Sequence, residues 1–476
     1  MEKTYDLFIN GKWKKPKKYL KVFLPYDGSL VGEAPDASLE EVEEAIKVAS
    51  KAKKFARKLS PYKRYEILSK ASEIMKKRKE EITKLISLET GKPIKEAEVE
   101  VERAIQTIIF SSEEAKRIYD EVIPLDSHPF GSGRIGLTIR EPKGVILAIT
   151  PFNAPFNLAC HKVGPALASG NTVVLKPSSL TPLTAYLLAD ILREAELPDG
   201  FFNVISGRSS NIGDFLVAHP EINMVSFTGS LEVGKRIRNI AGLKTVTLEL
   251  GSNSSVIIEP DIEIKNVLQG FISSAFSNSG QVCISLQRAY VHENIFNSFI
   301  EILREEVSKI KIGHPLDKET QISSLISPDA AKRVFSWIEE AIIQGAEKLV
   351  GGEIIGRATI TPTILSKTNF RMKVVCEEIF GPVVVIEPYK NLMEAITYVN
   401  NSKYGLQTGI FTSNIFNAFY AAKEIESGGV IINDFPSFRV DQMPYGGIKE
   451  SGLGREGPKF AIEEMTERKL IVIKNG

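Results

Sequence analysis

The chain has 476 residues, of which 25% are charged and 43% hydrophobic, so it has the composition of an ordinary soluble protein and a length that predicts about three domains. The net charge of +1 argues against nucleic acid or an anionic membrane as the main partner. Three cysteines without CxxC spacing, no apolar leader and no long apolar stretch exclude a disulfide framework and predict a cytoplasmic protein with no metal site and no membrane segment.

The first 120 residues predict a hairpin followed by scaffold helices. Residues 8–13 are typical of two short strands joined by an Asn10-Gly11 turn. From Ser38, which begins a capping box, apolar residues recur at helical spacing as far as residue 117. Residues 121–140 are rich in proline and glycine and predict an extended arm.

The middle third alternates short apolar strands with helical segments. This pattern predicts βαβ units and a parallel sheet that is covered on both faces. Ligands bind such sheets at the carboxyl ends of the strands. The predicted strands are residues 144–150, 171–177, 202–205 and 224–227.

A second alternating series, from residue 254 to about 432, predicts a second α/β domain. The C-terminal segment 468–474 is a lone strand that needs a partner. The arm at 121–140 is the candidate partner, within the subunit or across an oligomer.

Cys283 is the candidate nucleophile. It follows the polar run 277–281, so the thiol is expected where a loop meets the next element and a ligand can reach it. The alternative is a small buried packing residue. A thiol at this position becomes a nucleophile only if its pKa is lowered or a base lies nearby.

Two polar residues are candidates to assist the thiol. Glu249 lies in the apolar run 246–251, where it is either a solvent-facing residue of an alternating edge strand or a desolvated carboxylate suited to proton abstraction. Asn153 follows the strand 144–150, where it is either a turn residue or an amide donor to a developing oxyanion.

Two further segments suggest ligand contacts. Residues 227–234 run from strand through Gly229 and Ser230 into a helix, an arrangement that presents free N–H groups but lacks the GxGxxG spacing. Glu377 and Glu378 precede an apolar strand, and either is also consistent with a solvated surface acid.

Together these segments resemble the NAD(P)-dependent aldehyde dehydrogenases, in order and approximate spacing from about residue 7 to the C-terminus. The motifs that carry the resemblance are Thr150-Pro151-Phe152-Asn153, Lys176-Pro177-Ser178, Phe227-Thr228-Gly229-Ser230, Leu248-Glu249-Leu250-Gly251, Gly280-Gln281-Val282-Cys283, Glu378-Ile379-Phe380-Gly381-Pro382 and Pro444-Tyr445-Gly446-Gly447. Each motif is weak alone, whereas seven in register are specific.

The resemblance implies a role for each of the main candidates. Cys283 is the implied nucleophile, Glu249 the general base, and Asn153 the oxyanion donor together with the Cys283 backbone N–H. Glu378 is implied to contact the nicotinamide ribose. The full set of implied cofactor-binding residues is Thr150, Pro151, Phe152, Lys176, Ser178, Ser179, Gly213, Phe227, Gly229, Ser230, Leu250, Glu378 and Phe380.

The implied fold is α/β, with two open parallel-sheet domains and a β-strand oligomerisation arm. Residues 1–120 and 141–250 are expected to form the cofactor-binding domain and 251–445 the catalytic domain. Residues 121–140 and 458–476 are expected to form the arm of a homodimer or homotetramer.

This chain departs from the family pattern in two places. Ser252-Asn253 follow Gly251 where the family usually has Gly-Lys, and Phe152 stands where many members have tryptophan. The first change bears on how Glu249 moves or how cofactor packs, and the second is conservative.

The residues disfavour three alternatives to the oxidation of an aldehyde with hydrolysis to the acid. A CoA-acylating semialdehyde dehydrogenase generally lacks the base, so Glu249 favours hydrolysis. A non-catalytic protein of the same fold predicts loss of Cys283, Asn153 or Glu249, and all three are present. A thiol protease is disfavoured because none of the five histidines belongs to a recognisable motif with Cys283.

The substrate is indicated by residues 432–444, which are similar to the equivalent stretch of archaeal lactaldehyde dehydrogenases. We expect a small hydroxy- or carboxy-aldehyde, such as lactaldehyde, glyceraldehyde or succinate semialdehyde. Arg439 is a candidate to meet its oxygen atoms, and a surface or interface role is the alternative.

The cofactor is expected to be NADP or NAD, with NADP slightly favoured. Members restricted to NAD often carry glutamate at the position of Ser179, where this chain has a hydroxyl that can donate to a phosphate while Lys176 supplies charge. The alternative is that Ser178 and Ser179 only begin the turn before Thr181.

Overall fold

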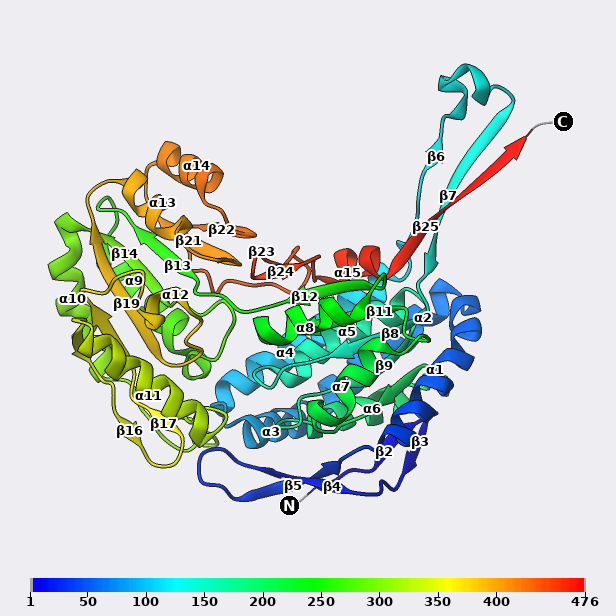
Figure 1. The fold of residues 1–476 in the computed structure, drawn as a ribbon, viewed down its shortest axis with the longest axis horizontal. Helices are drawn as coiled ribbons and strands as arrows, with labels where there is room; N and C mark the ends of the chain where they lie inside the picture. Colours follow the sequence, from blue (N-terminus) through cyan, green and yellow to red (C-terminus); the bar gives the residue numbers. More distant parts are fainter. Residues whose placement is uncertain (1–2, 475–476) are drawn as a thin grey trace.

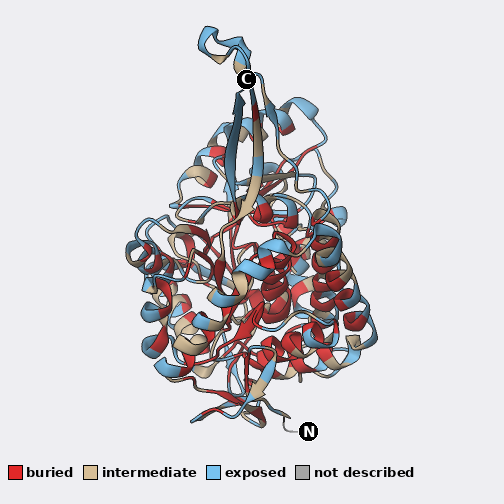
Figure 2. Cartoon of the chain, turned by 90° about the vertical axis from the view of Figure 1, so that its right-hand side faces the viewer, coloured by how far each residue is buried: buried red, intermediate tan, exposed pale blue. Residues whose placement is uncertain are grey.

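The computed structural model describes residues 3–474, in which two large sheets lie side by side and a long ribbon projects from one end (Figure 1). Figure 2 shows buried residues filling the body and mostly exposed or half-buried residues in the ribbon. No helix within these residues is both long and apolar enough to cross a membrane.

The first sheet has eight strands in the order β24-β12-β11-β8-β9-β10-β2-β3. Its five central strands are parallel and almost wholly buried, as their continuous apolar sequences predict. The bounds are β2 Leu7–Ile9, β3 Lys12–Lys14, β8 Val145–Ile149, β9 Thr172–Lys176, β10 Phe202–Val204, β11 Met224–Thr228, β12 Thr245–Glu249 and β24 Gly452–Leu453.

The predicted hairpin forms one edge of this sheet. Asn10 and Gly11 both have positive φ, 55° and 71°, as a tight two-residue turn requires. Strand β2 pairs with β10, so the hairpin covers an edge that would otherwise be open.

Helices cover both faces of the first sheet, and each face has its own hydrophobic cluster. The predicted capping box at Ser38 is present at the start of α1. Helices α1, α7 and α8 lie on one face, and α2 to α6 on the other. Their bounds are α1 Leu39–Lys58, α2 Pro61–Lys77, α3 Lys79–Thr90, α4 Ile94–Glu114, α5 Pro155–Ala168, α6 Leu183–Glu194, α7 Ser209–Ala218 and α8 Leu231–Ala241.

The second sheet has seven strands in the order β15-β18-β19-β14-β13-β21-β22, all parallel except β15. Its strands are β13 Ser255–Ile258, β14 Arg288–His292, β15 Glu347–Val350, β18 Thr363–Ser366, β19 Val383–Tyr389, β21 Gln407–Phe411 and β22 Gly429–Ile432. Its helices are α9 Ile264–Phe276, α10 Glu293–Ser308, α11 Pro328–Ile343, α12 Lys373–Cys376, α13 Leu392–Asn400 and α14 Ile415–Glu424.

Short elements complete the body. They are β1 Lys3–Thr4, β4 Tyr19–Phe23, β5 Leu30–Pro35, η3 Ser277–Gly280, β16 Ile354–Ile355, β17 Thr359–Ile360, β20 Tyr404–Gly405, β23 Ile448–Lys449 and α15 Pro458–Glu464. Helix α15 packs on α5 and α4 through Ala461 and Ile462, which are buried.

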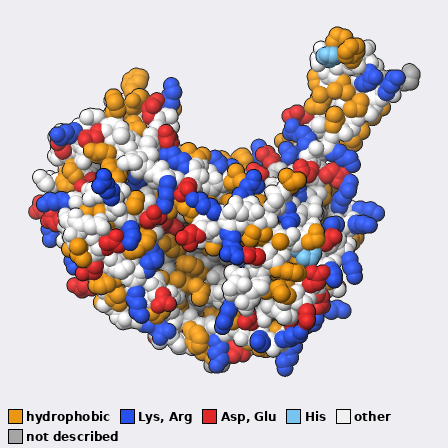
Figure 3. Space-filling model, in the orientation of Figure 1, with side chains coloured by type: hydrophobic (Ala, Val, Ile, Leu, Met, Phe, Trp, Pro, Cys, Tyr) orange, Lys and Arg blue, Asp and Glu red, His pale blue; other side chains and the backbone are white. Residues whose placement is uncertain are grey.

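The projecting ribbon contains the C-terminal strand and its predicted partner. Strand β25, Thr466–Lys474, pairs antiparallel with β7, Arg134–Pro142, over its whole length. Strand β6, Val122–Ile123, adds to β7, and two short turns, Leu125–Ser127 and Pro129–Gly131, form the tip. Hydrophobic side chains remain exposed along the ribbon (Figure 3), among them Phe130, Ile135, Ile139, Leu470, Val472 and Ile473.

Candidate active site

Cys283 is positioned by an unusual loop that follows α9. Asn278, Ser279 and Gly280 have consecutive positive φ values of 50°, 54° and 72°, a conformation that costs energy for serine and needs anchoring. The carboxylate of Glu96, a half-buried residue on α4, accepts the Asn278 backbone N–H at 2.6 Å. Gly280 is required because a Cβ there would lie 2.1 Å from the Gly381 carbonyl oxygen.

The thiol of Cys283 is half-buried, and its sulfur lies 2.9 Å from the Tyr445 hydroxyl. Burial raises the pKa of Cys283 to about 11. At neutral pH the resting group is therefore a thiol, and it must lose its proton to a base before it can attack.

Glu249 ends strand β12 and is 3% exposed, which excludes the solvent-facing alternative. Neither of its carboxylate oxygens has a hydrogen-bond partner among residues 3–474. Burial, followed by the nearby charge of Glu456, raises the pKa of Glu249 well above its ordinary value. An unsatisfied buried carboxylate of this kind is ready to accept a proton.

Asn153 connects the end of β8 to the nucleophile loop. Its Nδ2 donates to the Gln281 carbonyl at 2.8 Å, and Asn278 Nδ2 donates to the Asn153 carbonyl at 3.2 Å. These contacts hold the amide beside Cys283, with the second Nδ2 hydrogen still available to an oxyanion.

A cavity of about 510 Å³ reaches the residues on either side of Cys283. Four basic and two acidic side chains line it, together with polar residues at the ends of α4, α5 and α9. The lining includes Lys92, Lys95, Glu96, Glu100, Arg103, Asn153, Asn157, Ser274, Asn278, Val282, Ile284, Ser285, Ser437 and Arg439.

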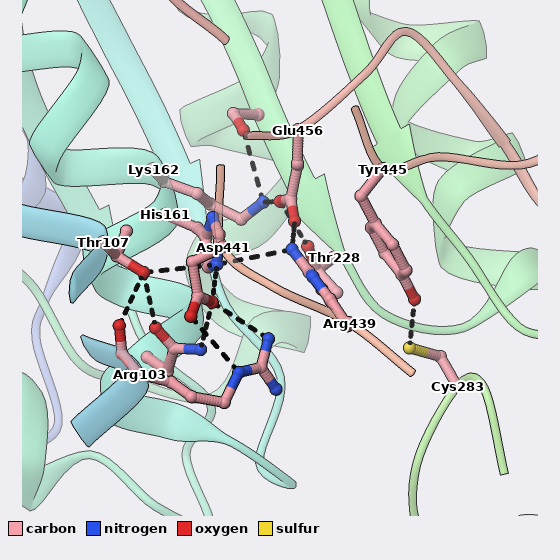
Figure 4. A network of polar contacts seen from close by, with 12 residues as sticks. Arg103, Thr107, His161, Lys162, Thr228, Cys283, Arg439, Asp441, Tyr445 and Glu456 are labelled. Atoms are coloured by element: carbon pink, nitrogen blue, oxygen red, sulfur yellow. Dashed lines mark hydrogen bonds and ion pairs between the residues drawn. The ribbon is translucent and has the colours of Figure 1, made fainter. Parts of the chain in front are cut away.

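A buried polar network lies behind this cavity (Figure 4). Glu456 accepts from Lys162 at 2.7 Å and from Arg439 at 3.1 Å. Although burial opposes it, these two cations hold the pKa of Glu456 well below its usual range. The Arg439 guanidinium lies 3.6 Å from the centre of the Tyr445 ring, and its Nε has no hydrogen-bond partner among residues 3–474.

Asp441 holds the other end of this network. It is 5% exposed and contacts His161 Nε2 at 2.9 Å and the Arg103 guanidinium at 2.9 Å. Although burial opposes it, the pKa of Asp441 is held well below its usual range by His161 and Arg103. Loop residues 439–441 are thus fixed against helices α4 and α5.

The expected cofactor residues lie at the carboxyl ends of the first sheet's strands. Lys176 is 2% exposed, its Nζ has the Pro177 carbonyl at 3.4 Å, and burial lowers its pKa to about 8. Ser230 begins helix α8 without a side-chain cap, so first-turn N–H groups remain free. These donors and the buried ammonium suit a phosphate-bearing dinucleotide.

Glu378 and Phe380 lie on the facing domain. Glu378 accepts the Ser252 backbone N–H at 3.0 Å, and burial raises its pKa to about 7. The rings of Phe380 and Phe152 meet edge to face at 5.7 Å. Gly213 lies in α7, where a Cβ would meet only Ser209, and Ser178 Oγ accepts the Leu180 N–H as in a turn.

The Ser252-Asn253 departure is accommodated away from the base. Asn253 donates to the Val375 carbonyl at 2.8 Å and accepts from Ser402 at 2.8 Å, while Arg288 donates to the Asn253 carbonyl. Asn253 therefore braces the second domain and leaves Glu249 unobstructed.

Sequence reasoning did not single out Lys162, Glu456, Arg103, Asp441 or His161, and it quoted Tyr445 only as part of a motif. The one available signal was Lys162, a lysine inside the apolar run of α5. A thiol, a buried base, an amide donor and a cavity together are suited to covalent chemistry at a carbonyl carbon.

Comparison with known proteins agrees with this chemistry. The sequence pattern described as "Aldehyde dehydrogenase family" matches residues 13–471. The chain belongs to the aldehyde dehydrogenase family. Aldehyde dehydrogenases are oxidoreductases, and the solved neighbours of this one include NADP and NAD⁺ complexes.

Three relatives of this aldehyde dehydrogenase are informative. A 3-sulfolactaldehyde dehydrogenase of Priestia aryabhattai is 46% identical over 99% of this chain and 98% of its own. A lactaldehyde dehydrogenase of Methanococcus aeolicus is 44% identical over 98% of this chain and 99% of its own. The structure of a glyceraldehyde-3-phosphate dehydrogenase from Methanocaldococcus jannaschii, complexed with NADP, is 39% identical with a TM-score of 0.92, covering 96% of this chain and all of its own.

Proposed function

We propose that this aldehyde dehydrogenase oxidises a small aldehyde that carries a hydroxyl group, an anionic group or both to the carboxylic acid with NADP⁺ or NAD⁺. The observation that carries the proposal is the cavity of about 510 Å³, which has Cys283 between its lining residues Val282 and Ile284 and the cationic Arg439 in its wall. 3-Sulfolactaldehyde, lactaldehyde and succinate semialdehyde fit this description.

The proposed reaction begins with Cys283. Its thiolate adds to the aldehyde carbon, and the oxyanion accepts hydrogen bonds from Asn153 Nδ2 and the Cys283 backbone N–H. The nicotinamide, when bound, is the hydride acceptor. Loss of hydride leaves a thioester on Cys283, and Glu249 takes a proton from water as it adds to the thioester carbon. Cleavage of the C–S bond then releases the acid and the thiolate.

Hydrolysis rather than transfer to CoA is proposed because the base is present and buried. Glu249 has a raised pKa and no hydrogen-bond partner for its oxygens within residues 3–474, the properties of a group that accepts a proton from water. Measuring acid and acyl-CoA products in the presence of CoA distinguishes the two outcomes.

The deciding experiment for substrate is a kcat/KM panel over short aldehydes that carry a hydroxyl, carboxylate, sulfonate or phosphate, with apolar and aromatic aldehydes for comparison. We expect the short aldehydes with polar or anionic groups to have the highest kcat/KM values. A clear preference for long apolar or aromatic aldehydes contradicts the proposal.

Arg439 is proposed to contact the end group of the substrate. Its Nε is a buried donor in the cavity wall that no acceptor in the described part of the chain contacts, and an anionic oxygen would accept its hydrogen bond. We expect Arg439→Met to lower kcat/KM for an anionic aldehyde by about 10- to 100-fold, the scale of losing one charge-assisted hydrogen bond. For neutral lactaldehyde the expected loss is smaller.

Lactaldehyde serves as the internal control for that substitution, because Arg439 also contacts Glu456 and the Tyr445 ring. Equal losses for the anionic and the neutral aldehyde would show that Arg439 acts only through those two residues.

NADP is proposed as a cofactor used at least as well as NAD. Ser179 is partly exposed and lies three residues after Lys176, the buried lysine that ends β9 and whose charge a phosphate would compensate. We expect Ser179→Glu to shift the NADP/NAD ratio of kcat/KM toward NAD by roughly 5- to 150-fold, equivalent to about 1 to 3 kcal/mol.

Ser308→Glu on α10, where Ser308 is exposed and its Oγ donates to the Glu305 carbonyl, adds the same charge away from the residues assigned to the cofactor and is the matched control. A wild-type enzyme strongly selective for NAD would show that another loop decides the choice.

The ribbon of β6, β7 and β25 is proposed to join copies of the chain as a homodimer or homotetramer. The exposed apolar residues along it support this assignment. Cytoplasmic location stays a prediction.

A further inference from the structure

The Tyr445 hydroxyl is the polar group that touches the nucleophile in this structure, at 2.9 Å from Cys283 Sγ (Figure 4). The two groups expected to assist the thiol are placed differently. Both Glu249 oxygens lack hydrogen-bond partners among residues 3–474, and Asn153 Nδ2 donates to Gln281. The hydrogen-bond partner of the resting sulfur is therefore Tyr445, a residue that has no role in the proposed reaction steps.

The phenol is held rigidly against the sulfur. Tyr445 is 2% exposed and packs with Ile284 and Leu406. Its backbone exchanges two hydrogen bonds with Glu456, at 3.1 and 2.7 Å, and Arg439 covers its ring at 3.6 Å. These three sets of contacts fix the position of the hydroxyl and leave the side chain no freedom to change rotamer.

Ionisation of the thiol fixes the direction of this hydrogen bond. A thiol can donate or accept, whereas a thiolate has no hydrogen, so the phenol must donate to it. Burial raises the pKa of Tyr445 well above its usual value, so the phenol keeps its proton throughout the working range. A charge-assisted O–H···S⁻ bond favours the thiolate.

We propose that Tyr445 is a further catalytic residue, whose hydroxyl donates to the Cys283 thiolate and holds it ionised and aimed at the substrate cavity. The inference rests on the proposed role of Cys283 as nucleophile. The thiol proton leaves to solvent or Glu249, and Tyr445 keeps its own proton throughout. When sulfur bonds to the aldehyde carbon it loses its charge, and the hydrogen bond from Tyr445 weakens.

Other charged side chains near the sulfur also shift the pKa of Cys283. Besides burial and the Tyr445 hydrogen bond, Arg439 lowers the pKa of Cys283, whereas Glu378 and Glu249 raise it. A substitution that removes only the phenolic oxygen leaves these charges in place. Tyr445→Phe therefore isolates the hydrogen bond.

The test is the pH dependence of Cys283 alkylation by iodoacetamide, a neutral reagent, followed by mass spectrometry without aldehyde or cofactor. In Tyr445→Phe we expect the pKa of the thiol to rise by about 1 and alkylation at pH 7.5 to slow about tenfold, because the thiolate fraction falls tenfold. The pre-steady-state burst of reduced cofactor is expected to slow similarly, with KM for the cofactor unchanged.

Tyr290→Phe is the matched control, because Tyr290 is also buried and its hydroxyl makes only long contacts among the described residues, with Arg288 on the same strand at 3.4 Å and with the Tyr398 carbonyl on α13 at 3.5 Å. An unchanged alkylation profile in Tyr445→Phe overturns the inference. If wild-type enzyme alkylated at Cys283 stays active, the proposed function itself fails.

Should Tyr445→Phe not fold, the wild-type chain made with 3-fluorotyrosine gives the answer. Its phenol is a stronger donor, so the pKa of the thiol is expected to fall, and an unchanged value also overturns the inference.

Discussion

Replacing Cys283 by alanine is expected to reduce aldehyde oxidation by at least about 10⁴-fold, since no covalent adduct can form without the sulfur. Cofactor affinity is expected to change little, because Lys176 ends β9 and Ser230 begins α8 in the first domain, whereas Cys283 lies in the loop that follows α9 in the second. Steady-state turnover and a cofactor titration by fluorescence measure the two quantities on the same preparation.

Cys376→Ala is the matched control for that substitution. Cys376 is also half-buried, but its sulfur lies 3.9 Å from the Arg371 carbonyl on a different element. It is expected to retain full activity. Full activity in Cys283→Ala would refute the proposed mechanism as a whole.

Glu249→Gln is expected to slow release of the acid by about 10²- to 10³-fold, because the amide cannot take a proton from water. The steps up to the thioester do not require Glu249 to activate water. A burst of reduced cofactor should therefore precede the slow steady-state release of the acid. Rapid mixing that follows the burst and the steady state of reduced cofactor resolves both phases.

Glu249 is also expected to determine how turnover depends on pH. A base works only when deprotonated, and the pKa of Glu249 is raised well above that of an ordinary glutamate. Turnover is therefore expected to fall as the pH drops through that raised value, and this acidic limb should be absent from the residual activity of Glu249→Gln.

Glu259→Gln provides a control carboxylate. Glu259 is buried at the end of β13, where Tyr389 and Asn417 donate to it, and it lies in the second sheet away from the cavity. If Glu249→Gln lowered burst and steady state equally, Glu249 would be structural or would be needed to form the thiolate.

Much of the fold could be predicted because its signals are local. Continuous apolar runs such as Val145–Ile149 predict buried parallel strands, and Asn10-Gly11 predicts the hairpin at the sheet edge. The pairing of β25 with β7 followed from a simple requirement, that a lone apolar strand needs a partner.

The buried network could not be predicted from the sequence, because its partners have no local relationship. Lys162 and Glu456 are 294 residues apart, and Arg103 and Asp441 are 338 apart. Nothing near Asp441 in the sequence distinguishes it from a surface acid of a loop. Only the packing of residues 439–456 against α4 and α5 makes these charges partners.

The contact between Tyr445 and Cys283 is of the same kind. Tyr445 lies 162 residues after the thiol, and the motif that contains it gives no indication of where its hydroxyl points. Arg439, by contrast, was suggested from the sequence as a contact for the substrate's oxygen atoms, and it lies in the wall of the cavity. The contact itself stays a prediction.

Strand β12, which carries Glu249, depends on a very late part of the chain. One of its edges is closed by β24, where Glu249 pairs with Gly452, and Leu250 donates to the Ser451 carbonyl. During synthesis on the ribosome, the other strands of the first sheet are made first, and the last of them, β12, ends at Glu249, which is 203 residues before Gly452 (452 − 249). Until residue 452 appears, the nascent sheet presents an open edge to other chains, so chaperone protection during translation matters most at the strand that bears the base.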